Sequence, residues 1–254
     1  MHEYRKQAVS DVILRRNLNL SYLSLTNRSY GVGKYDLMHL VTPDHVDLDY
    51  LALYSRPSEY NRTENTAVCF FEYDAVFDGR NGLWSAIYYN DTKLLDRYMR
   101  RFSKAGCFIS PDYSLCGDVP ESFNIDNIQR SRIVSIWLTL ECGKIVIPVI
   151  TYADERSFEY MLDGLEDCSI VAFSAKGSLR RKNQRELFRK AVSYTVDTLK
   201  NLKQIVVYDA SADFVKTETL YFSRAAEKGI EVTFPDNRLH ARNVCLRGRH
   251  HGQI

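Results

Sequence analysis

Short apolar runs alternate with amphipathic segments from about residue 66 onward, and this alternation constrains the fold more than any other feature. The runs are almost continuously apolar, which is typical of strands covered on both faces. Strands are predicted at residues 67–73, 106–110, 144–150, 169–174, 204–210 and 230–234. Strands separated by helical segments favour βα units and a mostly parallel sheet.

The segments between the runs carry helix signals. Between residues 90 and 106, apolar side chains recur at helical spacing and a glycine ends the pattern. Asn183, with Glu186 three residues later, predicts a capping box before the next helix. Pro148 cannot donate to a strand ladder, so the strand at 144–150 is expected to be short or bulged there.

Two architectures fit this α/β pattern: a TIM-like barrel, complete or incomplete, and an open doubly wound sheet. We favour the barrel, because no strand is followed by a glycine-rich phosphate turn and polar residues follow nearly every strand. Residues 67–240 are assigned to the α/β domain. Residues 1–66 are interpreted as an N-terminal segment packed on it, and 241–254 as a basic C-terminal tail.

Charge and cysteine content exclude several classes of protein. Lys and Arg number 34 against 32 Asp and Glu, so bulk charge gives no reason to expect attraction to a membrane or a nucleic acid. The six cysteines show no CxxC spacing and are interpreted as reduced core residues, without support for a metal site. No apolar stretch approaches the roughly 18–20 residues that span a bilayer, and the N-terminus lacks an apolar signal segment. We therefore expect a cytoplasmic protein with no membrane partner.

The candidate functional residues lie just beyond the strands, because ligands bind at the carboxyl ends of parallel strands. Several carboxylates gather there, as acid/base chemistry requires. The catalytic candidates are Asp112, Asp154 and Glu155. The ligand-binding candidates are Glu72, Asp74, Arg130, Arg132, Ser174, Lys176 and Asp209.

A structural explanation competes with each of these assignments. Acidic and hydroxyl residues after a strand very often cap the next helix or fold a turn, and Asp154 and Asp91 suit capping especially well. Asp112 is the hardest to explain in this way, because it directly follows Ser110-Pro111 and the next clear helix begins about ten residues later.

Arg130 and Arg132 are two residues apart on a predicted helix and so do not share a face. One of them is expected to point inward, either in a buried ion pair or as a clamp for a phosphate or substrate. The missing GxSxG spacing gives no support to a nucleophilic triad, and the missing Walker A spacing gives none to a phosphate-binding loop. No motif identifies a cofactor.

Several phrases together resemble one protein family. They are "FFEYD", "ISPDYSL…DVP", "QRSRIVSIWL", "GKIVIPVITYADERSFEYMLDGL", "SIVAFSAKGSL" and "QIVVYDAS". In combination they resemble the DUF4417 family of bacteriophages and other bacterial mobile elements, over about residues 68–236. The chain departs from the family pattern at Val149 and Tyr152, where asparagine and tryptophan are more usual.

The resemblance implies a phage or mobile-element origin but no activity. The positions it marks in this chain are Asp112, Arg132, Trp137, Asp154, Glu155 and Gly177. One hypothesis is a carboxylate-dependent enzyme that acts on a nucleotide, a nucleic acid or a glycosidic bond in the cytoplasm of a bacterial host. The alternative is a non-catalytic host-takeover or anti-defence protein, which binds a host protein or sequesters a nucleotide signal.

Overall fold

The computed structural model describes residue 25 and residues 27–251, and its strands form two parallel sheets. The five-stranded sheet has the order β10-β3-β4-β5-β6 and the three-stranded sheet the order β7-β8-β9, beside a small antiparallel pair, β1-β2. The strands are β1 (Gly31–Val32), β2 (Leu37–Met38), β3 (Tyr50–Leu53), β4 (Thr66–Cys69), β5 (Cys107–Ile109), β6 (Ile145–Ile147), β7 (Ile170–Ser174), β8 (Gln204–Tyr208), β9 (Glu231–Thr233) and β10 (Asp236–Asn237).

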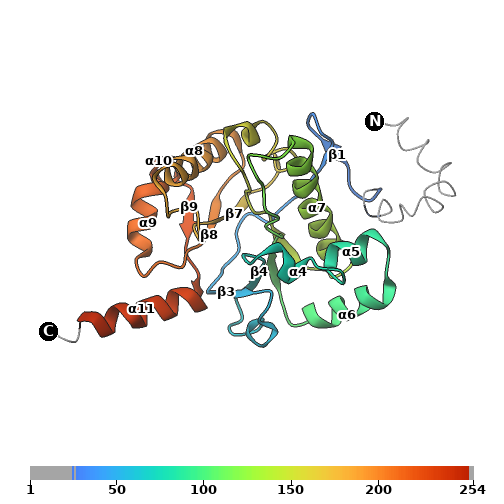
Figure 1. Ribbon diagram of the computed structural model, residues 1–254, viewed down its shortest axis with the longest axis horizontal. Coiled ribbons are helices and arrows are strands. Elements are labelled where there is room, and N and C mark those ends of the chain that lie inside the picture. The colour runs from blue at the N-terminus through green and yellow to red at the C-terminus, as the bar shows by residue number, and fades with distance from the viewer. Residues whose placement is uncertain (1–24, 26, 252–254) are drawn as a thin grey trace.

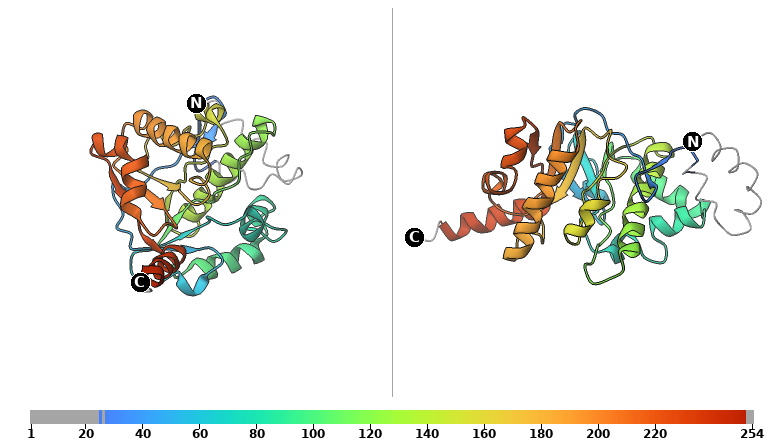
Figure 2. Two further views of the ribbon diagram at one scale, coloured as in Figure 1. Left: turned by 60° about the vertical axis from the view of Figure 1, so that its left-hand side comes forward. Right: turned by 90° about the horizontal axis from the view of Figure 1, so that it is seen from above.

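Helices connect the strands and lie outside them (Figure 1). They are η1 (Pro57–Glu59), α4 (Asp74–Phe77), α5 (Leu83–Tyr88), α6 (Thr92–Phe102), α7 (Glu121–Leu140), η2 (Glu155–Glu159), α8 (Lys182–Thr198), α9 (Phe214–Tyr221), α10 (Ser223–Glu227) and α11 (Arg238–His251). Figures 1 and 2 show α4 to α7 on one side of the strands and α8 to α10 on the other, while α11 projects away from the body.

The two parallel sheets meet at an isolated bridge between Val149 and Ala172. Ala172 accepts a backbone hydrogen bond from Ile150 at 2.9 Å and donates one to Pro148 at 2.8 Å. As expected, β6 stops before Pro148. The pairings therefore establish a mostly parallel α/β fold, but they do not join the described strands into one closed sheet.

Strands β3 to β8 place alternate residues in two different apolar cores. One face packs under the helices, where Val68, Phe108 and Phe173 are fully buried. The other faces of β3 to β8 supply a separate apolar cluster that the two sheets share. Its buried members are Leu51, Ala67, Cys69, Phe71, Cys107, Ile109, Ile147, Val149, Ile170, Ala172, Val206 and Tyr208.

The termini of the described region add elements to this core. Residues 1–66 supply β3, which lies between β10 and β4. Residues 1–24 and 26 of that predicted segment, and 252–254 of the predicted tail, lie outside the described residues, while α11 covers the start of the tail.

The caps predicted for α6 and α8 had different outcomes. Asp91 caps α6, since its carboxylate accepts from the N–H of Leu94 at 3.0 Å. The predicted capping box at Asn183 is wrong, because α8 already begins at Lys182. The backbone N–H of Arg181, just before the helix, donates instead to the side chain of Gln184.

Candidate functional site

The turn that carries Asp112 follows β5 and is fixed by serine hydroxyls. The fully buried Ser110 accepts a hydrogen bond of 2.9 Å from the backbone N–H of Val149. Ser131 of α7 donates to the carbonyl of Pro111 at 2.7 Å. These bonds join the end of β5 to the neighbouring strand and to α7, and so hold Asp112 at the carboxyl end of the sheet.

The Asp112 carboxyl group has an environment that favours its protonated form. Part of the residue's surface remains accessible, but protein surrounds the carboxyl group, and this burial raises its pKa to about 7. The charge of Asp74 raises it further. A hydrogen bond of 3.3 Å from Thr151 Oγ1 and the positive charge of Lys176 act in the opposite direction. Asp112 can therefore exchange a proton near neutral pH.

Lys176 brings the loop after β7 to the same site. Its Nζ donates to the carbonyl of Phe71 at 2.9 Å, and its charge reaches Asp112. Gly177 follows with a φ of +88°, a conformation that glycine adopts readily. Tyr152 completes the group, because burial and the charge of Asp112 both raise its pKa. The ends of β4, β5, β6 and β7 thus converge around Asp112.

Glu72 and Asp74 lie beside the site but already have hydroxyl partners. Glu72 accepts from the backbone N–H of Ser55 at 2.9 Å and from its hydroxyl at 2.6 Å. Asp74, at the start of α4, accepts from the backbone and the hydroxyl of Ser114, the latter at 3.0 Å. Of the two carboxylates, Asp74 has a charge that reaches Asp112.

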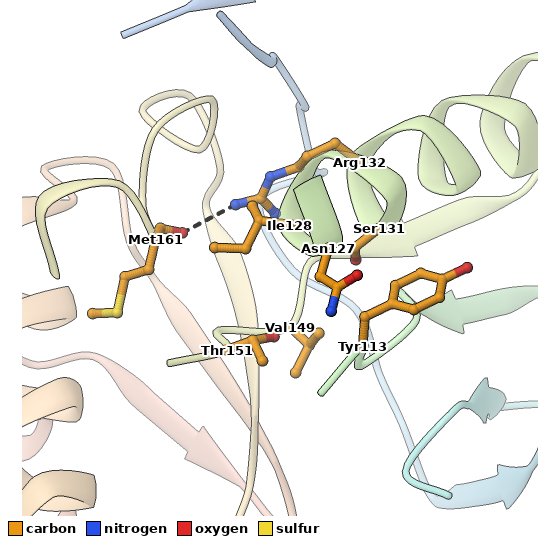
Figure 3. Close-up of a pocket in the computed structure, with 8 residues that line it drawn as sticks. All are labelled: Tyr113, Asn127, Ile128, Ser131, Arg132, Val149, Thr151 and Met161. Carbon is orange, nitrogen blue, oxygen red and sulfur yellow. Dashed lines mark hydrogen bonds between the residues drawn. The ribbon is translucent and has the colours of Figure 1, made fainter. Parts of the chain in front are cut away.

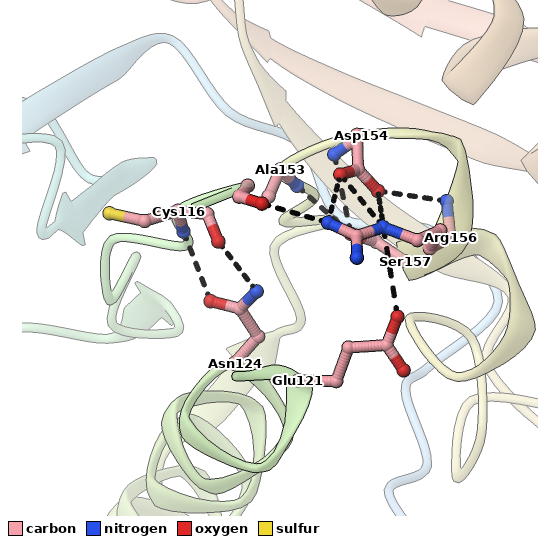
Figure 4. Close-up of polar contacts among 8 residues, drawn as sticks. Cys116, Glu121, Asn124, Ala153, Asp154, Arg156 and Ser157 are labelled. Carbon is pink, nitrogen blue, oxygen red and sulfur yellow. Dashed lines mark hydrogen bonds and ion pairs between the residues drawn. The ribbon is translucent and has the colours of Figure 1, made fainter. Parts of the chain in front are cut away.

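Asp154 and Glu155 each form an ion pair, and Figure 4 shows that of Asp154 with Arg156. Asp154 caps η2 and binds Arg156 at 2.7 Å, and this hydrogen bonding lowers the Asp154 pKa. Arg156 also donates to the carbonyl of Gly117 at 2.8 Å, in the loop after β5. Glu155 binds Lys190 of α8 at 2.6 Å. Asp154 therefore has the capping role that competes with catalysis, and it stays ionised.

Arg130 and Arg132 point in different directions from α7, as predicted. Arg130 is half-exposed, binds Asp126 at 2.8 Å and lies over the Trp84 ring at 5.6 Å. Arg132 is only 2% exposed and donates to the carbonyl of Met161 at 3.1 Å (Figure 3). It lines a small cavity together with Thr151, the partner of Asp112.

Ser174 and Asp209 occupy the ends of β7 and β8. The carbonyl of Ser174 accepts from the Ser178 hydroxyl at 3.2 Å, within the loop that carries Lys176. Asp209 is buried and accepts from the hydroxyls of Ser211 and Thr217, each at 2.7 Å. Its carboxylate therefore organises the turn before α9.

Thr151 was missed as a site residue, although a signal for it exists. Ile147 and Val149 face the shared core, and side chains alternate along a strand, so Thr151 falls on the same face at the strand's end. Hydroxyl residues at that position are the natural hydrogen-bond partners of a neighbouring carboxyl group.

Comparisons with known sequences agree with the phage resemblance. The sequence model of DUF4417, a domain of unknown function, matches residues 30–224. The chain belongs to the DUF4417 family. The match begins earlier and ends sooner than the resemblance over residues 68–236 had indicated, and it contains every candidate site residue.

Two phage proteins are similar to this DUF4417 protein. The Gene 1 protein of Mycobacterium phage L5 is 30% identical over 165 residues, which are 64% of this chain and 66% of that protein. The Gene 1 protein of Mycobacterium phage D29 is 28% identical over 181 residues, or 65% and 63% of the two chains. The matches thus cover less than two thirds of either relative. The DUF4417 chain is a phage-associated protein.

None of the helices within residues 27–251 has the length and apolar composition needed to cross a membrane. Among the same residues, no group of three or more His, Cys, Asp and Glu side chains is arranged to hold a metal ion.

Proposed function

We propose that this protein is a carboxylate-dependent enzyme acting on a nucleotide, a nucleic acid or a glycosidic bond in the cytoplasm of a bacterial host, with Asp112 as its general acid. One observation carries the proposal: Asp112 is an interior carboxyl group with a pKa of about 7 at the carboxyl end of the sheet. General acids work best when their pKa lies near the working pH.

The chemistry would use two carboxyl groups in different protonation states. Asp112 donates its proton to the leaving group as the bond breaks, while an ionised carboxylate stabilises positive charge or activates water. Asp154, whose pKa is lowered, and the paired Glu155 are the proposed ionised partners. Asp74 is a further candidate, because its charge reaches Asp112.

A TIM-like barrel is the architecture we propose for the site. Three observations support it: the two sheets share one apolar cluster, the Val149–Ala172 bridge joins one pair of edges, and only Phe234 and Pro235 separate β9 from β10 at the other. In such barrels the active site lies at the carboxyl ends of the strands, where Asp112 is found.

The charge around the loop after β7 supports an anionic substrate. Residues 176–185 contain five cationic side chains and no acidic one. They are Lys176, Arg180, Arg181, Lys182 and Arg185. Such a basic segment attracts phosphate groups and accelerates their encounter with the site.

Ligand-induced stabilisation is the direct test. Wild type, Asp112→Asn and the control Asp118→Asn, an exposed residue of the same loop, would be heated with nucleotides, cyclic dinucleotides, short DNA and short RNA. A bound ligand raises the melting temperature. We expect one class to stabilise all three proteins and to be turned over by wild type and Asp118→Asn only. Undiminished turnover by Asp112→Asn would remove Asp112 from catalysis.

A second function, binding of a host protein, is favoured by a surface hollow on another face. It is lined in part by Trp84, Tyr88, Tyr89 and Arg130, and these residue types dominate the binding energy of protein interfaces. Affinity capture from host lysate with wild type and Tyr89→Ala tests this alternative. A host protein retained by the wild type and lost by the variant would support it, and equal retention by both would count against it.

A further inference from the structure

Arg132 is a buried cation without a matching anion. Its side chain is among the largest that are fully enclosed. Within the described part of the chain it makes one hydrogen bond, from Nη2 to the carbonyl of Met161, and its buried Nε has no partner there. Among the described residues, no carboxylate lies within 4 Å of the guanidinium, although the charges of Glu166 and Asp163 favour its charged form.

Such an arrangement is costly for the folded protein. A guanidinium has five N–H donors and stays charged, so a buried one is normally matched by carboxylates or several acceptors. Burial accordingly lowers the Arg132 pKa to about 10. The carbonyl of Met161 supplies only one acceptor, so the remaining donors are available to a group that enters from outside.

Figure 3 shows the cavity that Arg132 lines, with Thr151 on its wall. Polar side chains of Tyr113, Asn127 and Ser131 line it, and so does Thr151, which holds Asp112. In this conformation the cavity has room for about one water-sized group. A cavity of this size accepts one oxygen atom of an anion.

We propose that Arg132 forms an oxyanion subsite, in which its free N–H groups bind one oxygen of a phosphate or carboxylate group of the substrate. This inference rests on the proposed function, since it places the substrate's anion on one side of Thr151 and the reacting bond beside Asp112 on the other. The charge-assisted hydrogen bonds of arginine suit both anions.

Anion titrations test the subsite without knowledge of the substrate. Wild type would be heated with sodium phosphate or sodium acetate, with sodium chloride keeping the ionic strength constant. We expect a saturable rise in melting temperature, about 3 °C at about ten times the dissociation constant. Stabilisation by phosphate alone, or by acetate alone, identifies the group that binds. No saturable rise with either salt overturns the subsite.

Variants place the effect at Arg132. Arg132→Met should lose the anion effect, whereas the control Arg130→Met, two residues away on the same helix, should keep it. If Arg132→Met does not fold, an NMR titration of the wild-type protein tests the subsite instead. Phosphate or acetate should shift the signal of one arginine Nε–H. Thr151→Val, which changes the cavity wall, should alter that titration. An anion effect that persists in folded Arg132→Met would overturn the proposal.

The anion subsite at Arg132 and the catalytic role of Asp112 can be tested independently. Asp112→Asn should keep the anion effect, because binding at Arg132 needs no proton from Asp112. An active Asp112→Asn protein that still binds the anion would retain the subsite and reject the catalytic role. A protein that loses the anion effect only when Arg132 is replaced, and loses turnover when Asp112 is replaced, supports both.

Discussion

The hydroxyl of Thr151 donates to the carboxyl group of Asp112 at 3.3 Å, and this contact joins the ends of two neighbouring parallel strands. The hydrogen bond favours the ionised carboxylate, while burial favours the protonated form and prevails, so that the Asp112 pKa lies at about 7. The same threonine lines the cavity that contains Arg132. Thr151 therefore connects the proposed acid to the buried cation.

Thr151→Val should raise the Asp112 pKa above its wild-type value. Valine keeps the shape of threonine but cannot donate the hydrogen bond that stabilises the carboxylate. The measurement is an NMR titration of the Asp112 carboxyl carbon. Thr219→Val, which removes an exposed hydroxyl on α9, serves as the control and should leave that titration unchanged. An unaltered Asp112 pKa in Thr151→Val would show that the 3.3 Å hydrogen bond from Thr151 does not stabilise the ionised carboxylate.

Asp112→Asn should change how stability depends on pH. The Asp112 pKa is about 7 in the folded state and about 3.9 in an unfolded chain. Between these values the folded state holds a proton that the unfolded state has lost, so the contribution is complete below about pH 4 and disappears as the pH rises through 7. Relative to Asp112→Asn, the free energy of unfolding of wild type should fall by on the order of 1–3 kcal/mol between about pH 5 and pH 8.

Urea unfolding of both proteins at each pH measures this difference. Asp118→Asn provides the control, since its carboxyl group is exposed in the same loop. Parallel stability curves for wild type and Asp112→Asn would mean that the Asp112 pKa is not raised in the folded protein.

Tyr208→Phe should not destabilise the protein and should stabilise it by about 1 kcal/mol. The Tyr208 hydroxyl is buried in the shared core and has no partner among the residues that the structure describes, which costs about 1–3 kcal/mol. Phenylalanine removes that cost and keeps the ring contact with Phe71, whose centroid is 4.9 Å away.

Tyr60→Phe is the matched control, because the Tyr60 hydroxyl is equally buried but donates to the carbonyl of Tyr54 at 2.6 Å. The Tyr60→Phe variant should have a free energy of unfolding about 1 kcal/mol lower than that of wild type, measured by urea unfolding. A larger loss for Tyr208→Phe than for Tyr60→Phe would reveal a partner for the Tyr208 hydroxyl in solution.

The sequence pattern predicted β4, β5, β7 and β8 because these strands are apolar on both faces. The pattern missed β3 because Tyr50–Leu53 lies between loop-like sequences. It missed β10 because Asp236 and Asn237 are both polar, and they form a strand through their pairing with β3. The position of Asp112 followed from its place directly after a predicted strand.

The contacts that surround Asp112 could not be predicted in the same way. Spacing on α7 indicated that either Arg130 or Arg132 points inward, but the choice depends on how the helix rotates against the sheet. The hydrogen bond from Thr151 depends on the register of β5 with β6, in which Ile109 faces Ile147. Such registers are set by packing across the whole core.

Ser110→Ala should destabilise the protein by about 2 kcal/mol, because the Ser110 hydroxyl is the acceptor for the buried N–H of Val149 at 2.9 Å. Alanine leaves that donor without a partner, and an unsatisfied buried group costs about 1–3 kcal/mol. Ser103→Ala, at the exposed end of α6, should change stability by less than about 0.5 kcal/mol. Removal of the Ser110 hydroxyl should also change the NMR titration of Asp112, because the same turn holds both residues. A destabilised protein with an unchanged Asp112 titration would show that this turn does not set the Asp112 pKa.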